Sequence, residues 1–179
     1  KLIVSSARLV TIAGGKWTTF RKRAEDTVNA AIKTGGLVYV PCSTHHHSIH
    51  GHTSMSDHSN HLSIYGSDAA AILELIKSEP ELAECLHPSY EYVKAEIVWA
   101  ARYEMARTIE DVLARRIRIL FLDARAAIAM APEVVHLLAI ELNRDQQWMD
   151  DQLKSFVELA KGFLLASNEE SFTLNLTHE

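Results

Sequence analysis

An apolar pattern of helical period begins at Ser67 and continues to about residue 165, and it limits the possible folds more than any other part of the sequence. Its clearest part is a stripe of side chains three and four residues apart: Ile109, Val112, Leu113, Ile117, Leu120 and Phe121. Such side chains share one face of an α-helix, and that face has to be buried against other helices. The sequence therefore predicts a compact bundle of about five helices over residues 67–166.

Capping residues and prolines give approximate ends to these helices. One continuous apolar face over residues 92–105 predicts a single helix. Thr108 and Asp111 resemble a capping box, so the next helix is expected to run from there through the stripe to Phe121. Pro132 is typical of a first helical turn, where its missing N–H is not needed, and it predicts the start of another helix.

The first 41 residues differ from this body in charge and in pattern. They hold seven Lys and Arg residues against two acidic ones, a net charge of +5, whereas the rest of the chain carries −10. The β-branched run Arg8–Ala13 predicts a strand, a helix is expected over residues 18–32, and Leu37–Val40 is a candidate second strand. An isolated strand leaves its backbone groups unpaired. Because the chain also begins at Lys1 rather than Met, we expect it to be a piece of a longer protein.

Histidine is concentrated in the connector between these parts, residues 42–66. Seven of the ten histidines lie between positions 45 and 61. Imidazoles at this density bind Zn²⁺ or Ni²⁺, but a specific site also needs fixed geometry and partners that orient the ligands. The connector has no H-E-x-x-H pattern and no Cys pair. We expect a loop with only adventitious metal binding, and a specific metal site is the alternative; the residues concerned are His45, His46, His47, His50 and His52.

The turn Ala13–Thr19 between the predicted strand and helix carries the most chemical information. Its two glycines allow a ligand to approach the backbone, and a helix start presents N–H groups with partial positive charge, to which Lys16 adds a full charge. This combination favours a phosphate, or a negative charge that develops on a cofactor. The alternative is a tight structural turn. A P-loop is excluded, because Val10 and Trp17 occupy positions where that motif requires Gly and Ser or Thr.

Other functional classes find little support. Arg115, Arg116, Arg118 and Arg125 follow acidic residues within an acidic body, where opposite charges usually pair, so nucleic-acid binding is not expected. No apolar run approaches the roughly 18 residues of a membrane span. No catalytic triad, nucleophile elbow or calcium loop can be identified.

Four blocks of sequence together resemble one family. Ile12–Arg21 and Ala24–Val28 resemble the end of the flavin domain of FAD-dependent glycerol-3-phosphate dehydrogenase, which carries a G-G-K-x-T-T-[YF]-R run. His61–Gly66 and Asp111–Arg118 resemble that family's helical C-terminal domain. Their order and spacing match, and the resemblance covers nearly the whole chain apart from the His-rich segment and the tail.

The resemblance implies a full-length enzyme that oxidises sn-glycerol 3-phosphate to dihydroxyacetone phosphate by hydride transfer to FAD. Electrons would then pass to membrane quinone, or to oxygen, in an enzyme peripheral to the bacterial cytoplasmic membrane or the mitochondrial inner membrane. By position in the motif, the flavin would be lined by Gly14, Gly15, Lys16, Trp17 and Thr18. Lys16 is also a candidate for contact with the substrate phosphate or hydroxyl, and no residue of this chain is assigned as catalytic.

The same resemblance divides the chain. Residues 1–41 would be the C-terminal remnant of the FAD-binding domain, 42–66 a linker, 67–166 the helical domain and 167–179 a polar tail. The upstream FAD-binding domain of the same protein would be the main partner, and a homodimer is possible. Because no G-x-G-x-x-G is present, we expect the isolated chain neither to bind FAD tightly nor to turn over. The alternative function is a helical protein-interaction module with no direct catalytic role.

Overall fold

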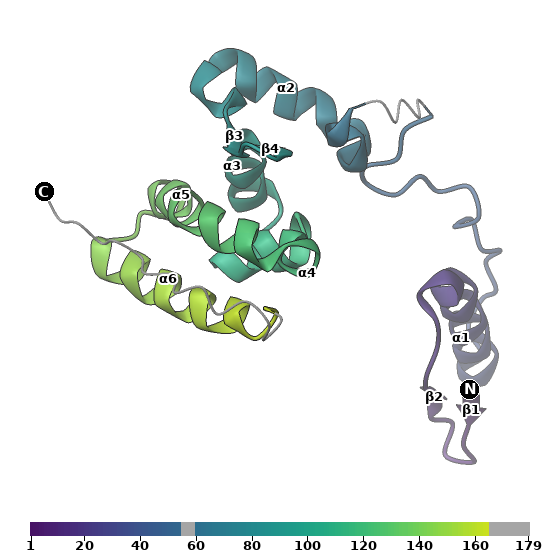
Figure 1. Ribbon diagram of the computed structural model, residues 1–179. Coiled ribbons are helices and arrows are strands. Elements are labelled where there is room, and N and C mark those ends of the chain that lie inside the picture. The colour runs from purple at the N-terminus through teal and green to yellow at the C-terminus, as the bar shows by residue number, and fades with distance from the viewer. Residues whose placement is uncertain (55–59, 165–179) are drawn as a thin grey trace, which may run out of the picture. The chain divides into compact units, whose positions relative to one another are not determined.

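The computed structural model describes residues 1–54 and 60–164, so the predicted tail at 167–179 and part of the linker lie outside the described residues. The chain divides into two compact units, Lys1–His52 and Thr53–Glu179. Helices dominate both units, in agreement with the predicted class (Figure 1). No helix in the described ranges is long and apolar enough to cross a membrane.

The first unit is a β-hairpin followed by a helix. Strands β1 (Leu2–Val4) and β2 (Val10–Ile12) pair antiparallel, with Leu2 opposite Ile12. The short 3₁₀ helix η1 (Trp17–Thr19) leads directly into α1 (Phe20–Gly35). The predicted strand and helix are confirmed, whereas Leu37–Val40 is not a strand. Strand β1 was not predicted, because a three-residue strand is too short to show alternation of apolar and polar residues.

A left-handed residue ends α1. Gly36 has φ 66°, and its N–H donates to the carbonyl of Ile32. Only glycine adopts this conformation without a steric penalty, which is why the second glycine pair of the sequence stops the helix.

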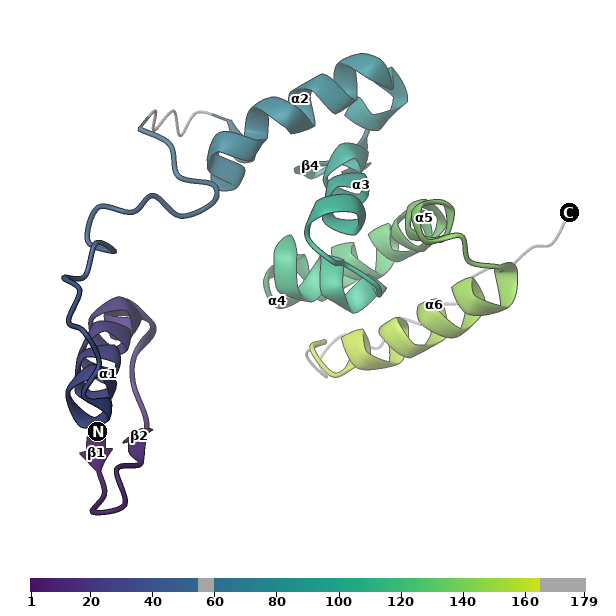
Figure 2. The same cartoon turned by 180° about the vertical axis from the view of Figure 1, so that it is seen from behind.

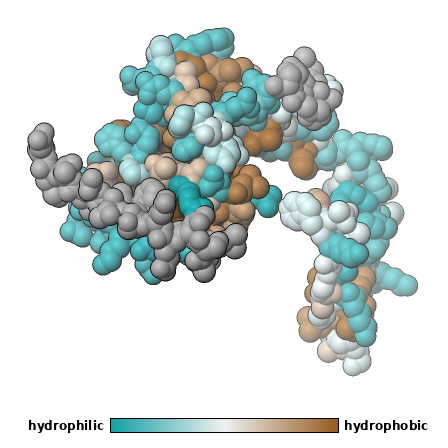
Figure 3. All heavy atoms as spheres, in the orientation of Figure 1, coloured by the Kyte–Doolittle hydropathy of each residue, from teal (hydrophilic) through white to brown (hydrophobic). Residues whose placement is uncertain are grey.

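The first unit buries none of its side chains fully. Many of its large apolar side chains are exposed, and Figure 3 shows apolar residues at its surface. They include Leu2, Ile3, Val4, Leu9, Ile12, Trp17, Phe20, Val28, Leu37, Val38, Tyr39, Val40 and Ile49. Contiguous apolar surface of this kind marks a contact with other protein or with a ligand.

The second unit contains the predicted bundle. Within residues 60–164 it has five α-helices: α2 (Ala69–Ser78), α3 (Lys94–Tyr103), α4 (Ile119–Leu122), α5 (Ala124–Leu142) and α6 (Gln146–Lys161). Shorter elements connect them: the 3₁₀ helices η2 (His61–Asp68) and η3 (Pro80–Ala83), the hairpin β3 (Cys85–His87) and β4 (Tyr90–Val93), and the π-helix η4 (Asp111–Arg116).

The main core lies around α5. This helix packs against α6 and α3, and Figures 1 and 2 show α6 beside it from both sides. Its alanines allow close approach of the neighbouring helices, and the cluster includes the fully buried Ile97, Ile109, Leu113, Ile119, Met130 and Leu138. A smaller cluster joins η2, α2, η3 and the start of α3: Leu62, Ile72, Leu82, Val93, Ala95, Val98 and Trp99.

The predicted continuous helix from Thr108 to Phe121 is broken. The capping box is confirmed, since the N–H of Asp111 donates to Thr108 Oγ1 (3.1 Å) and the N–H of Thr108 donates to Asp111 Oδ2 (3.0 Å). The helix then widens into η4, and Arg118 takes a left-handed conformation with φ 64° before α4 begins. The wider π turn shifts the helical phase, so the stripe stays buried up to Leu120 while Phe121 is exposed.

Two further helix limits differ from the prediction. Tyr92 and Val93 belong to the hairpin rather than to α3, and Met105 lies beyond its end with φ 61°. Pro132 lies inside α5, which begins instead at Asp123, whose side chain accepts from the N–H of Ala126 (3.0 Å). Packing of the buried face compensates for the single backbone hydrogen bond that a proline removes.

Candidate functional site

The glycine turn links the end of β2 to the start of the α1 segment. Gly14 has φ 68° and Gly15 has φ 152°, both outside the range that L-residues commonly adopt. A Cβ at Gly14 would meet nothing within 4 Å, so this side of the turn is open. A Cβ at Gly15 would lie 2.9 Å from Arg23 Nε. The first glycine is therefore required by backbone conformation, and the second by both conformation and the neighbouring side chain.

Lys16 occupies the cap position of the helical segment. Its backbone is extended (φ −117°, ψ 149°), and its carbonyl accepts from the N–H (3.1 Å) and the Oγ1 hydroxyl (3.2 Å) of Thr19. Trp17 and Thr18 are the first residues beyond the cap, where helical N–H groups have no acceptor within the helix. These groups give the helix start a partial positive charge.

A groove of about 500 Å³ runs beside this turn. Its lining is formed by Ile12, Gly14, Gly15, Lys16, Phe20, Arg23, Ala24, Thr27 and Val28. Trp17 and Thr18 are not among the lining residues; the Trp17 ring stacks on Phe20 with centroids 5.3 Å apart and is 83% exposed. Of the five residues predicted for the site, the structure brings three to the groove.

Two cations of the groove are not neutralised. In residues 1–54 and 60–164, neither Lys16 nor Arg23 forms an ion pair with a carboxylate. Arg23 Nη2 donates instead to the carbonyl of Ala13 (2.9 Å). No sequence pattern distinguished Arg23 from the two basic residues before it, Arg21 and Lys22. A groove with mainly apolar lining, two free cations and a helix start fits an anionic or electron-accepting ring edge.

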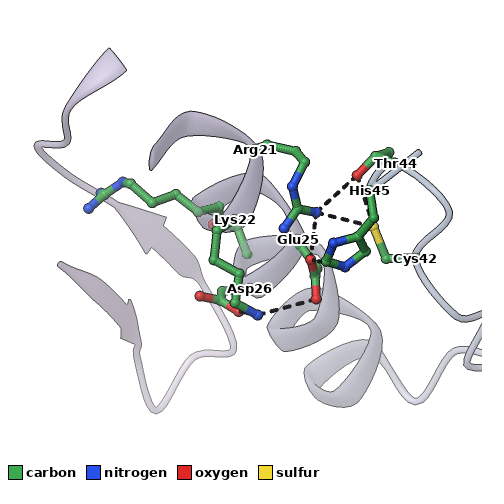
Figure 4. A network of polar contacts seen from close by, with 9 residues as sticks. Arg21, Lys22, Glu25, Asp26, Cys42, Thr44 and His45 are labelled. Carbon is green, nitrogen blue, oxygen red and sulfur yellow. Dashed lines mark hydrogen bonds and ion pairs between the residues drawn. The ribbon is translucent and has the colours of Figure 1, made fainter. Parts of the chain in front are cut away.

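A polar network lies on another face of α1 (Figure 4). Arg21 Nη1 donates to Glu25 Oε2 (2.7 Å) and to Thr44 Oγ1 (3.2 Å), and it lies 4.0 Å from Cys42 Sγ. His45 Nε2 lies 3.2 Å from Glu25 Oε2. The hydrogen bond with the Thr44 hydroxyl lowers the pKa of the Cys42 thiol, and Arg21 lowers that of Glu25. Through Thr44 and His45, the network joins the start of the His-rich segment to α1.

The histidines of this segment border a second cavity of about 850 Å³. His45, His46, His47 and His52 contribute to its wall, together with α1 residues, whereas His50 does not. Among the described residues, no three His, Cys, Asp or Glu side chains are grouped as a metal site requires.

Of the four arginines considered in the sequence, Arg115 and Arg116 form the predicted ion pairs, whereas Arg118 and Arg125 form none with the described carboxylates. Arg115 binds Glu110 and Asp111, and Arg116 Nε lies 3.2 Å from Glu104 Oε2. The described residues thus offer no arginine cluster at Arg115 and Arg116 that is free to bind a nucleic acid.

One carboxylate of the second unit is almost completely buried. Glu96, 1% exposed, accepts from the N–H of Val93 (2.7 Å, Oε2) and from the Tyr65 hydroxyl (3.0 Å, Oε1). His61 Nε2 lies 3.3 Å from Oε2, within ion-pair distance but with poor hydrogen-bond geometry. Burial raises the pKa of the Glu96 carboxyl, and the hydrogen bonds oppose this rise only in part. The arrangement joins η2 to α3.

Comparisons of the chain with protein families and with curated proteins agree with one another. The profile of the C-terminal domain of alpha-glycerophosphate oxidase matches residues 6–149. The chain is 34% identical to the mitochondrial glycerol-3-phosphate dehydrogenase of Macaca fascicularis over 181 residues, which cover 90% of this chain and 24% of the relative. It is 32% identical to a probable mitochondrial glycerol-3-phosphate dehydrogenase of Caenorhabditis elegans, covering 98% of this chain and 28% of the relative.

A plant relative extends the same pattern. The chain is 31% identical to a mitochondrial glycerol-3-phosphate dehydrogenase of Arabidopsis thaliana, covering 90% of this chain and 30% of the relative. The chain therefore spans only 24% to 30% of the length of these curated relatives. No solved structure matches the chain.

Proposed function

Because this chain belongs to the family of the C-terminal domain of alpha-glycerophosphate oxidase, we propose that it is the C-terminal portion of a flavoprotein. That enzyme oxidises sn-glycerol 3-phosphate to dihydroxyacetone phosphate and passes electrons through FAD to quinone. The observation that carries the proposal is the glycine turn, where Lys16 and the helix start face an open groove within the matched residues. The names of the relatives, all glycerol-3-phosphate dehydrogenases, support the substrate.

The groove residues have distinct tasks in this enzyme. FAD, when bound, supplies the hydride acceptor. Gly14 and Gly15 would allow the backbone to approach the flavin, and Lys16 would place its charge at the flavin edge. Trp17 and Thr18 do not line the groove, but their N–H groups at the helix start would add partial positive charge, and the exposed Trp17 ring would add apolar contact. Positive charge at this edge favours the reduced cofactor, because reduction adds negative charge there.

The exposed apolar surface of the first unit supports the assignment of this part of the chain to a separate domain. We assign residues 1–41 to the FAD-binding domain, 42–66 to a linker, 67–166 to the helical domain and 167–179 to the tail. In this organisation, upstream residues of the same protein cover side chains such as Ile3, Val38 and Val40. Without that cover the FAD site is incomplete, so the isolated chain should neither bind FAD tightly nor turn over.

The relatives also support a location. Those from monkey, worm and plant are all named mitochondrial, so we assign the protein to the mitochondrion, peripheral to the inner membrane, where quinone is its electron acceptor. The bacterial cytoplasmic membrane, the other location that the sequence suggested, receives no support from these names.

One surface of the bundle supports the second candidate function, a protein-interaction module. Phe121, Leu122 and Phe163 are exposed, and the rings of Phe121 and Phe163 meet edge to face with centroids 5.5 Å apart. Aromatic patches of this kind are enriched at protein interfaces, and here they support a homodimer contact. A monomer by light scattering would count against this second function.

Substitution of Lys16 tests the main proposal. In the full-length protein, Lys16→Ala should lower kcat for sn-glycerol 3-phosphate about a hundredfold, the usual effect of losing one electrostatic partner of a reacting group. Lys33→Ala is the matched control, because Lys33 is an exposed lysine in the last turn of the same helix. Equal turnover in both variants would remove Lys16 from the site. Stoichiometric yellow flavin on the isolated chain would show that the upstream domain is not needed for the cofactor.

A further inference from the structure

The first turn of helix α1 carries three consecutive basic residues, and these form different contacts. Arg21 pairs with Glu25 (2.7 Å), and Lys22 pairs with Glu25 (3.2 Å) and Asp26 (2.9 Å). Arg23 has no carboxylate partner in the parts of the chain that the structure describes. Asp26 lies three residues further on, about one helical turn away, so the orientation of Arg23 away from it reflects another contact.

That contact is the glycine turn. The Arg23 guanidinium reaches from α1 back to the end of β2 and donates to the carbonyl of Ala13 (2.9 Å). Its stem occupies the space where any side chain at position 15 would stand, with Cδ and Cζ each 3.3 Å from an ideal Cβ on Gly15. Arg23 thereby contacts the turn at Ala13 and at Gly15, and it lines the groove together with Lys16.

We propose that Arg23 is a second cationic residue of the flavin site, which positions the Ala13–Lys16 turn and adds its charge to that of Lys16. The inference rests on the proposed function. A purely structural role would need only a hydrogen-bond donor to the Ala13 carbonyl, and a neutral amide could supply it. An unpaired guanidinium beside an apolar wall is screened less than one in open water, so its charge acts on whatever occupies the groove. That charge should favour the reduced cofactor over the oxidised one.

The experiment compares three single variants of the full-length holoprotein. Arg23→Gln removes the charge and keeps a donor, Arg23→Lys keeps the charge on a different donor geometry, and Lys22→Gln removes a neighbouring charge that is already paired. The readouts are the midpoint potential of the bound flavin, its dissociation constant, and the thermal unfolding midpoint. Arg23→Gln should reduce the preference for reduced over oxidised flavin about tenfold, a fall of about 30 mV for a two-electron couple. Arg23→Lys should shift it less, and Lys22→Gln should leave it unchanged.

A wild-type potential in Arg23→Gln overturns the proposal, as does an equal shift in Lys22→Gln, which would indicate a general charge effect. If Arg23→Gln fails to hold flavin, Arg23→Lys still decides the matter, because it keeps the charge and should hold flavin with a potential lowered by less than about 30 mV. Failure of the proposed function has a different signature, namely a wild-type flavin that sn-glycerol 3-phosphate does not reduce. A wild-type protein that holds no flavin overturns both.

Discussion

Replacement of Glu96 by alanine should cost the second unit a large part of its stability. The carboxylate is buried at the start of α3, and its two oxygens serve donors from two elements: the backbone N–H of Val93 and the hydroxyl of Tyr65 on η2. His61, also on η2, approaches the same carboxylate. Alanine removes every acceptor at this point and leaves these groups in a site that water does not reach.

The size of the effect follows from the contacts. Each buried donor that loses its acceptor costs about 1–3 kcal/mol, so Val93 and Tyr65 together give about 2–6 kcal/mol. We therefore expect a loss of about 4 kcal/mol from a domain whose total stability is about 5–15 kcal/mol. With a urea slope of about 2 kcal/mol per molar, the unfolding midpoint should fall by about 2 M.

Urea unfolding followed by Trp fluorescence and far-UV circular dichroism measures this loss. Trp99 belongs to the same small cluster and reports on it directly. Glu96→Gln keeps one acceptor oxygen and the side-chain shape, so its midpoint should lie between wild type and Glu96→Ala. Glu91→Ala is the control, because Glu91 is an exposed glutamate on the adjacent strand β4. A Glu96→Ala midpoint equal to that of Glu91→Ala would refute the argument that this carboxylate joins η2 to α3.

Two further predictions concern charges that join elements of the bundle. Lys94 binds both Glu133 (2.7 Å) and Glu84 (2.8 Å), and these carboxylates raise its pKa. Lys94→Met should lower the free energy of unfolding in urea by about 1 kcal/mol at low salt. The loss should be smaller at high salt, because solvent and salt screen partly exposed ion pairs. The N–H of Ala126, and then the Tyr90 hydroxyl, hold the pKa of Asp123 below its usual value. A carboxyl whose pKa is lower in the folded state stabilises the fold above its unfolded pKa, and that contribution disappears as pH falls through the folded pKa. Thermal unfolding below about pH 4 should therefore depend less steeply on pH in Asp123→Asn than in wild type, and identical slopes would contradict the assignment.

Periodicity predicted the helical bundle because the apolar side chains that form one helix face recur at a fixed spacing along the sequence. The stripe from Ile109 to Leu120 is buried as expected, although the π-helix and the left-handed Arg118 interrupt the helix that carries it. Neither feature leaves a pattern in the sequence, since each arises from how η4 and α4 fit against α5. The same limit explains why Pro132 was taken as a helix start: its position inside α5 depends on packing around the helix.

The glycine turn shows how far a sequence can define a candidate site. Gly14, Gly15 and Lys16 were identifiable because glycines, a lysine and a helix start in succession have direct chemical consequences.

The helical class, the basic first segment and the position of the turn follow from the order of residues along the chain. Packing in three dimensions is needed to place Arg23 at that turn while Arg21 and Lys22 face carboxylates, and to bring Glu96 to Tyr65 from 31 positions away. Side-chain pairing depends on which surfaces pack together, whereas backbone conformation and amphipathic pattern depend on neighbours along the chain.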